Sequence, residues 1–91
     1  MDRRVREVTH GAQFELSCRT LADSVSPAKI EELLRPVKWL IARGAEDFPC
    51  TVDGISIYRY ERIDRYPSLV FYFTIDSETQ CTLRLVRLVD E

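Results

Sequence analysis

The sequence is poor in the residues that usually mark a metal, redox or phosphate site. Its three cysteines, Cys18, Cys50 and Cys81, are too widely separated for a zinc site, and an odd number does not suit a disulfide framework. His10 is the single histidine and would be the one base available to a cysteine nucleophile. We therefore expect reduced cysteines, no metal, no cofactor and no cysteine–histidine catalysis.

Glycine-rich loops and long apolar runs are missing as well. The three glycines stand apart from one another, which excludes a glycine-rich phosphate loop. No run approaches the ~20 apolar residues of a membrane-spanning helix. The basic start, MDRRVREVTHG, is not followed by an apolar stretch and does not resemble a secretory signal. We expect a cytoplasmic protein that does not associate with membranes.

The composition is that of one folded domain covering residues 1–91. Hydrophobic residues make up 45% and charged residues 31%, as in ordinary globular chains. The net charge of −2 lacks the basic excess of most nucleic-acid-binding domains. The basic residues are nearly all arginine, which binds phosphate and carboxylate groups in a bidentate geometry. A GC-rich genome would produce the same bias.

The first half of the chain predicts an antiparallel helix hairpin over about residues 12–43. Apolar residues recur at helical spacing at Phe14, Cys18, Leu21 and Val25. Ser26 and Pro27 then form a helix-start signal, and a second stripe follows at Ile30, Leu33, Leu34, Val37, Leu40 and Ile41. Pro36 lies inside this stripe, so we expect a kink or a break near Arg35.

The second half predicts an antiparallel β-meander over about residues 55–90. Three runs rich in β-branched and aromatic residues are separated by short turns, and residues 1–10 could add a short N-terminal strand. The fold class is therefore α+β, with the hairpin packed on a small sheet. The central run is apolar on both faces, and one hairpin covers one face. We assign partner binding to the face of Leu69, Phe71 and Phe73, by an antitoxin-like segment, another protein or a second copy in a homodimer.

The order of elements resembles the RelE/ParE superfamily of toxins from bacterial toxin–antitoxin modules, over roughly residues 5–90. The two closing strands carry the resemblance through Val70, Tyr72, Ile75 and Asp76, followed by Leu83, Leu85 and Val86. The run YRYERI, residues 58–63, is similar to the basic strand of that family. The resemblance implies an antitoxin partner. It also implies one of two actions: mRNA cleavage on the ribosome, or inhibition of DNA gyrase by binding.

If the chain cleaves RNA, the resemblance gives Arg59, Glu61 and Arg87 as catalytic residues. Glu61 would be the general base, and the two arginines would hold the phosphate. Further arginines would contact RNA or another target, namely Arg62, Arg65 and Arg84. The alternative is that these charges decorate exposed sheet edges and pair with one another.

The sequence also departs from the family pattern. The family arginine that opens the central strand aligns with Leu69, or with Ser68 if the register slips, and the chain ends in Asp90 and Glu91. Residues 51–91 carry five basic against seven acidic side chains. Besides an active toxin, the alternatives are a degenerate toxin or a non-enzymatic inhibitor, encoded by a phage or mobile element, and an unrelated α+β interaction domain. The charge distribution favours binding of a protein over cutting of RNA.

Overall fold

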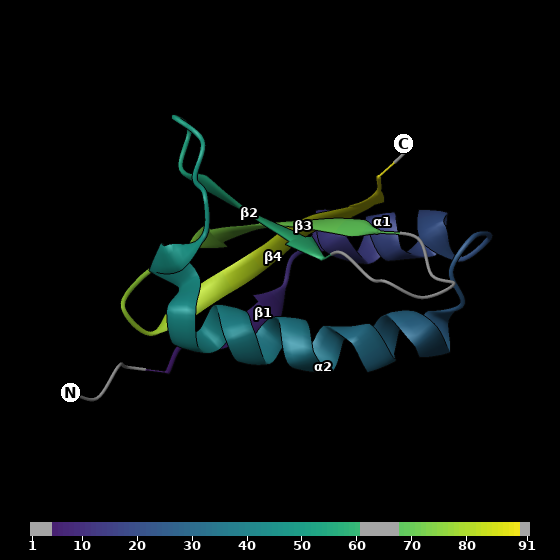
Figure 1. The fold of residues 1–91 in the computed structure, drawn as a ribbon, viewed down its shortest axis with the longest axis horizontal. Helices are drawn as coiled ribbons and strands as arrows, with labels where there is room; N and C mark the ends of the chain where they lie inside the picture. Colours follow the sequence, from purple (N-terminus) through teal and green to yellow (C-terminus); the bar gives the residue numbers. More distant parts are fainter. Residues whose placement is uncertain (1–4, 61–67, 90–91) are drawn as a thin grey trace.

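The computed structural model describes residues 5–60 and 68–89, which form an α+β fold of two helices and a four-stranded sheet (Figure 1). Along the chain the elements are β1 (Glu7–His10), α1 (Ala12–Leu21), α2 (Pro27–Gly44), the 3-10 helix η1 (Ala45–Asp47), β2 (Ile55–Tyr60), β3 (Leu69–Ile75) and β4 (Gln80–Leu88). The predicted fold class is confirmed at this level. Within the described residues, no helix is both long enough and apolar enough to span a bilayer.

The sheet is mixed, and its strand order is β1-β4-β3-β2. Strands β2, β3 and β4 pair antiparallel, as predicted for a meander. The simple meander prediction needs correction, because β1 joins the sheet beside β4 and runs parallel to it, from Glu7 opposite Gln80 to His10 opposite Leu83. A parallel neighbour requires a crossover connection, which the helices and the first two meander strands provide.

Both helices lie where the apolar spacing placed them. The Ser26 side chain accepts a hydrogen bond from the backbone amide of Lys29 at 3.2 Å, and Pro27 occupies the first turn of α2. The break expected near Arg35 is absent, because α2 continues through Pro36. The Pro36 side chain is exposed, so its ring lies outside the core.

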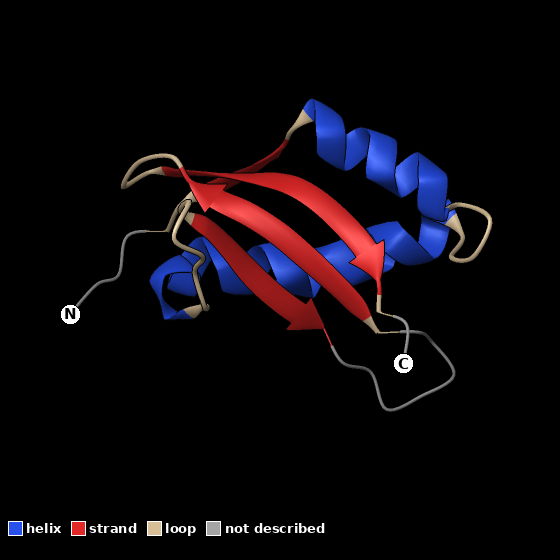
Figure 2. Cartoon of the chain, turned by 90° about the horizontal axis from the view of Figure 1, so that it is seen from above, coloured by secondary structure: helices blue, strands red, loops and turns tan. Residues whose placement is uncertain are grey.

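The core lies between the helices and one face of the sheet. In Figure 2, α2 passes behind the sheet and α1 runs along its β4 side. Phe14 of α1 and Phe71 of β3 are fully buried, with ring centroids 6.5 Å apart. Val37 and Ile41 of α2 are equally buried. The same strands therefore have a second face that neither helix covers.

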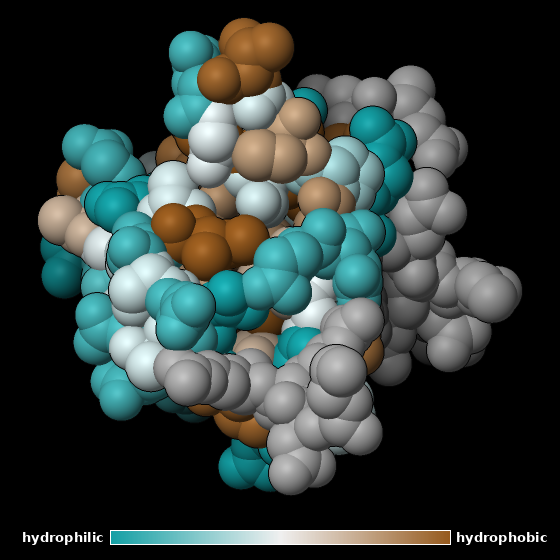
Figure 3. All heavy atoms as spheres, turned by 90° about the vertical axis from the view of Figure 1, so that its left-hand side faces the viewer, coloured by the Kyte–Doolittle hydropathy of each residue, from teal (hydrophilic) through white to brown (hydrophobic). Residues whose placement is uncertain are grey.

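Other segments shield parts of both sheet edges. β1 pairs with the first half of β4, and α1 covers the second half, where the Val86 amide donates to Ser17 Oγ at 3.0 Å. At the opposite edge, the Ile57 amide donates to the Pro49 carbonyl at 2.9 Å. The loop before β2 then projects from the sheet, and its Val52 is fully exposed at 103%. Figure 3 shows hydrophobic atoms at the top of the molecule, the end at which this loop projects in Figure 1. Such shielding limits strand pairing with other chains.

Candidate functional site

The sheet face opposite the helices carries the three predicted site arginines that the structure describes. We call it the open face. Side chains alternate along each strand, and the core positions Phe71, Phe73 and Leu83 identify the opposite set. The open face comprises Glu7, Thr9, Ile55, Ile57, Arg59, Val70, Tyr72, Thr74, Thr82, Arg84, Leu85 and Arg87.

A β-bulge in β4 determines which side chains reach this face. Phe73 pairs with Leu83, but Tyr72 pairs with Leu85, so Arg84 is an extra residue in β4. After the bulge, Val86 faces the core at 2% exposure and Arg87 faces outward. The bulge therefore places Arg84 and Arg87 on the same face although they are three residues apart.

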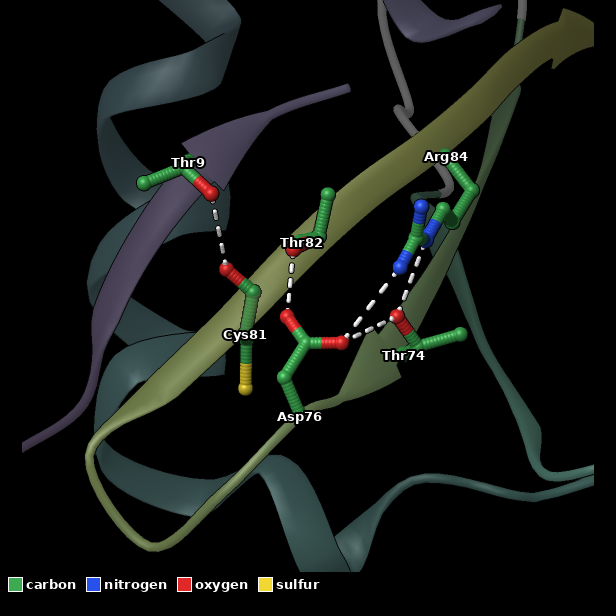
Figure 4. Close-up of polar contacts among 6 residues, drawn as sticks. All are labelled: Thr9, Thr74, Asp76, Cys81, Thr82 and Arg84. Carbon is green, nitrogen blue, oxygen red and sulfur yellow. Dashed lines mark hydrogen bonds and ion pairs between the residues drawn. The ribbon is translucent and has the colours of Figure 1, made fainter.

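At one end of the open face, three polar side chains surround Asp76 (Figure 4). Thr74 Oγ1 donates to Asp76 Oδ1 at 3.0 Å, and Thr82 Oγ1 donates to Asp76 Oδ2. Arg84 donates from Nε to Thr74 Oγ1 at 3.0 Å, and its Nη2 lies 3.4 Å from Asp76 Oδ1. Desolvation raises the pKa of Asp76, but the hydrogen bonds from Thr82 and Thr74 and the Arg84 charge outweigh it and lower that pKa below its ordinary value. Asp76 is therefore a fixed anion near neutral pH.

The other end of the face carries two arginines on either side of Val70. The register places Arg59 of β2 and Arg87 of β4 directly opposite Val70 of β3. These two positions are thus two strand spacings apart, about 10 Å. Arg87 Nε donates to the Tyr72 hydroxyl at 2.8 Å, and its guanidinium carbon lies 5.7 Å from the centre of the Tyr72 ring. Arg87 is thereby held against the Tyr72 ring, two strands away from Arg59.

Three of the six predicted catalytic or target-binding residues therefore share one surface. Arg59, Arg84 and Arg87 all belong to the open face. Glu61, Arg62 and Arg65 lie outside the described residues. The structure thus places three of the five predicted arginines, but not the predicted general base.

The assignment of partner binding to Leu69, Phe71 and Phe73 needs correction. These side chains are 1%, 0% and 0% exposed and form part of the core under the helices. The two faces of β3 were both apolar in sequence, and the bulkier aromatic set fills the space beneath the helices. Val70 is also buried, at 2% exposure, so a partner that contacts this sheet would meet Tyr72, Leu85 and the arginines of the open face instead.

Sequence reasoning missed the polar support of the arginines. Thr74 and Thr82 flank the turn that contains Asp76, and they lie opposite each other in the β3–β4 pair. Two threonines placed symmetrically about an acidic turn were the available signal, because cross-strand threonines often share hydrogen-bonding partners. The family resemblance includes Tyr72 but does not predict its contact with Arg87.

A second concave surface lies between the two helices and encloses about 600 Å³. At its rim His10 Nδ1 is 3.1 Å from Glu15 Oε1. Burial, with a smaller contribution from Glu15, raises the pKa of the Cys18 thiol in its wall, which disfavours a reactive thiolate. Among the residues that the structure describes, no group of three or more His, Cys, Asp and Glu side chains could hold a metal ion.

No protein-family model, curated protein or solved structure matches the chain. The open face, with its arginines and its lack of helix cover, is therefore the feature from which a function has to be inferred.

Proposed function

We propose that this protein is a growth inhibitor of the RelE/ParE toxin type that acts by binding a protein target through the open face. The observation that carries the proposal is the placement of Arg59 and Arg87 on either side of Val70, with Tyr72 beside Arg87, on the face without helices. DNA gyrase is the candidate target that the sequence resemblance suggests. An antitoxin would neutralise the protein by covering the same face.

The make-up of the open face supports recognition of a protein. Arginine and tyrosine are the side chains that most often dominate protein–protein binding energy, especially beside apolar surface. Here Ile57 and Leu85 lie on either side of Tyr72, and Leu85 is 36% exposed. Arg87 is already oriented by Tyr72, which lowers the entropic cost of ordering it on binding. An acidic surface with apolar neighbours would complement this face.

The carboxylates that the structure describes on the same face do not support RNA cleavage. Cleavage requires a group that removes the proton of the 2′-hydroxyl close to the groups that hold the phosphate. In the described part of the chain, Asp76 and Glu7 lie at the far end of the sheet from Arg59 and Arg87, roughly 20 Å along the strands at the usual rise per residue. Asp76 is also engaged by Arg84 and two threonines. Neither Asp76 nor Glu7 is therefore placed to remove the proton of a 2′-hydroxyl whose phosphate is bound by Arg59 and Arg87.

Ribosome-dependent mRNA cleavage is the second candidate. The arginines at the two positions that flank Val70 favour it, because guanidinium groups carried on neighbouring strands could bind successive phosphates of an RNA backbone. It requires Glu61 as the general base, as the family resemblance implies.

The test compares the two activities with the same purified protein. Gyrase supercoiling and mRNA cleavage on translating ribosomes are measured in parallel, alongside growth after induced expression. We expect growth arrest and inhibited supercoiling without cleavage, and both effects should be lost in the double variant Arg59→Ala/Arg87→Ala. The matched control is Arg19→Ala on α1, which removes an exposed arginine from the helix side and should leave both effects intact.

The other outcomes identify the error. Cleavage of ribosome-bound mRNA that Glu61→Gln abolishes would replace the binding proposal with the catalytic one. Growth without arrest, together with normal supercoiling and intact mRNA, would contradict both candidates.

A further inference from the structure

The outer side of α2 carries a hydrophobic and charged stripe that no described segment covers. We call it the outer stripe: Glu32, Pro36, Trp39, Leu40 and Arg43, spaced so that they follow one face of the helix. The core residues of α2 occupy the opposite face, toward the sheet. Trp39 is 56% exposed and Leu40 is 41% exposed. In Figure 1, α2 forms the lower boundary of the molecule, so the outer stripe faces away from the sheet.

Trp39 is the single tryptophan of the chain, and its position is supported from within the helix. The Arg43 guanidinium carbon lies 4.2 Å from the centre of the Trp39 ring, and Arg43 Nη1 donates to the Trp39 carbonyl at 3.3 Å. A large aromatic side chain that is held in place but exposed loses little entropy on binding, which is typical of interface anchors. The outer stripe thus has the character of a contact surface.

The charges of the stripe are arranged so that it complements itself. Glu32 lies in the N-terminal half of α2 and Arg43 in its last turn. The two residues are equally far from the middle of the stripe, and so are Pro36 and Trp39. A second copy packed antiparallel therefore brings Glu32 of each chain next to Arg43 of the other, and each Trp39 onto the other chain's Pro36. A single rotation axis satisfies both pairings, as a twofold-symmetric interface requires.

We propose that the outer stripe is the interface of a homodimer in which two copies of α2 pack antiparallel about a twofold axis. Glu32 Oε2 lies 3.1 Å from Lys29 Nζ in the same helix, and a second copy would let Glu32 contact Arg43 of that copy as well. An anionic lipid surface would repel Glu32, so a second copy fits the outer stripe better. The 18 residues of α2 span about 27 Å, which places the contact at the small end of specific interfaces. We therefore expect a dissociation constant of about 1 µM or weaker. The inference does not depend on the proposed target.

The dimer would give the open face a new property. Since α2 and the open face lie on opposite sides of the molecule, the two open faces of a dimer point outward and away from each other. Each dimer could then engage two targets, or two sites on one symmetric target. Such bivalent engagement raises apparent affinity without new contacts, provided that the geometry fits.

The intrinsic fluorescence of Trp39 tests the proposal directly, because no other tryptophan contributes. The full chain is diluted through the expected dissociation constant, and emission, acrylamide quenching and mass by sedimentation are followed together. We expect the emission maximum to move to longer wavelength and quenching to increase as dimers dissociate.

Charge reversal distinguishes this interface from any other. The single variants Glu32→Arg and Arg43→Glu should each remain monomeric, because like charges would face each other across the axis. An equimolar mixture of the two should form heterodimers, since both contacts then join opposite charges. Within one helix the two positions are about 16 Å apart, too far to rescue each other in a monomer. Arg19→Glu on α1 is the control for a general charge effect, and circular dichroism checks that each variant folds.

Several results would overturn the inference. A monomer with unchanged Trp39 emission at the highest concentration would exclude the dimer. A dimer that both charge reversals leave intact would place the interface elsewhere. A blue shift of Trp39 on vesicles of anionic phospholipid, with the free protein monomeric, would assign the stripe to a lipid surface instead.

Discussion

The two faces of the sheet are built from the same strands but differ in burial and in the side chains they carry. Toward the helices, Phe71 and Phe73 are fully buried among apolar side chains. On the open face, the intervening Tyr72 is in contact with Arg87 and partly exposed. Adjacent residues of β3 thus lie in different environments, so we expect mutations to alter stability and the proposed recognition separately. Substitutions on each face can test that separation, and the largest loss of stability is expected for the buried face.

Replacing Phe71 by alanine should cost about 3–5 kcal/mol of the free energy of unfolding, because the ring is fully buried between Phe14 and Tyr58. Tyr72→Ala, one residue along on the open face, is the matched control and should cost clearly less. Urea unfolding of both variants measures the difference. A Tyr72→Ala variant that is as destabilised as Phe71→Ala would show that the open face is also a core.

Replacing Ser17 by alanine should cost about 1–2 kcal/mol, because the Val86 amide loses its acceptor at the partly buried edge of β4. Hydrogen exchange at the Val86 amide should accelerate in parallel. Thr20→Ala on the exposed side of α1 removes a comparable hydroxyl, bonded to the Leu16 carbonyl, and serves as the control. Equal exchange rates at Val86 in Ser17→Ala and in the wild type would mean that α1 does not protect this edge.

Replacing Asp76 by asparagine should lower stability at neutral pH by less than about 1 kcal/mol, because the Arg84 ion pair is exposed to solvent. The folded-state pKa of Asp76 lies below the ordinary value of 3.8. Its contribution is therefore present above pH 3.8 and is lost as the pH falls through the folded-state pKa. Unfolding curves of the wild type and Asp76→Asn should accordingly converge as the solution is acidified. A gap that widens in acid would contradict this assignment.

Replacing Arg87 by alanine should leave the free energy of unfolding within about 0.5 kcal/mol of the wild type, since the side chain lies on the surface. Inhibition of supercoiling should nevertheless fall, because Arg87 flanks Val70 on the proposed binding face. Thermal unfolding and the supercoiling assay on the same sample separate the two effects. Loss of inhibition that merely follows loss of folded protein would argue against a recognition role.

Local signals were sufficient to predict the helices. The Ser26–Pro27 start and the periodic apolar residues act within one or two turns, so they can be read without knowing the rest of the fold. The parallel pairing of β1 could not be read in this way. That strand has four residues, and its neighbour is more than 70 positions away in the sequence. Partner choice over such a distance depends on tertiary packing.

The candidate site was predicted in its residue types but not in its orientation. Arg59, Arg84 and Arg87 were singled out from the sequence, and the structure places them on one face. Which face of β3 met the helices was undetermined, because both of its faces are rich in apolar side chains. In the sequence, the apolar alternation of Cys81, Leu83 and Leu85 continues across the bulge. This alternation therefore does not indicate that β4 contains an extra residue.

The bulge at Arg84 reverses the alternation of core-facing and outward-facing residues along β4. Before it, odd-numbered residues face the core, and after it, even-numbered residues do. The face that Arg87 occupies thus depends on the extra residue in β4 as well as on the polarity of its side chain. Without the inversion, Arg87 would oppose Leu69 inside the core and Val86 would take its place outside. Deletion of Arg84 would preserve the face of every remaining residue of β4, whereas deletion of Val86 would move either Leu85 or Arg87 to the core face. We therefore expect β4 to tolerate a one-residue deletion best at the bulge.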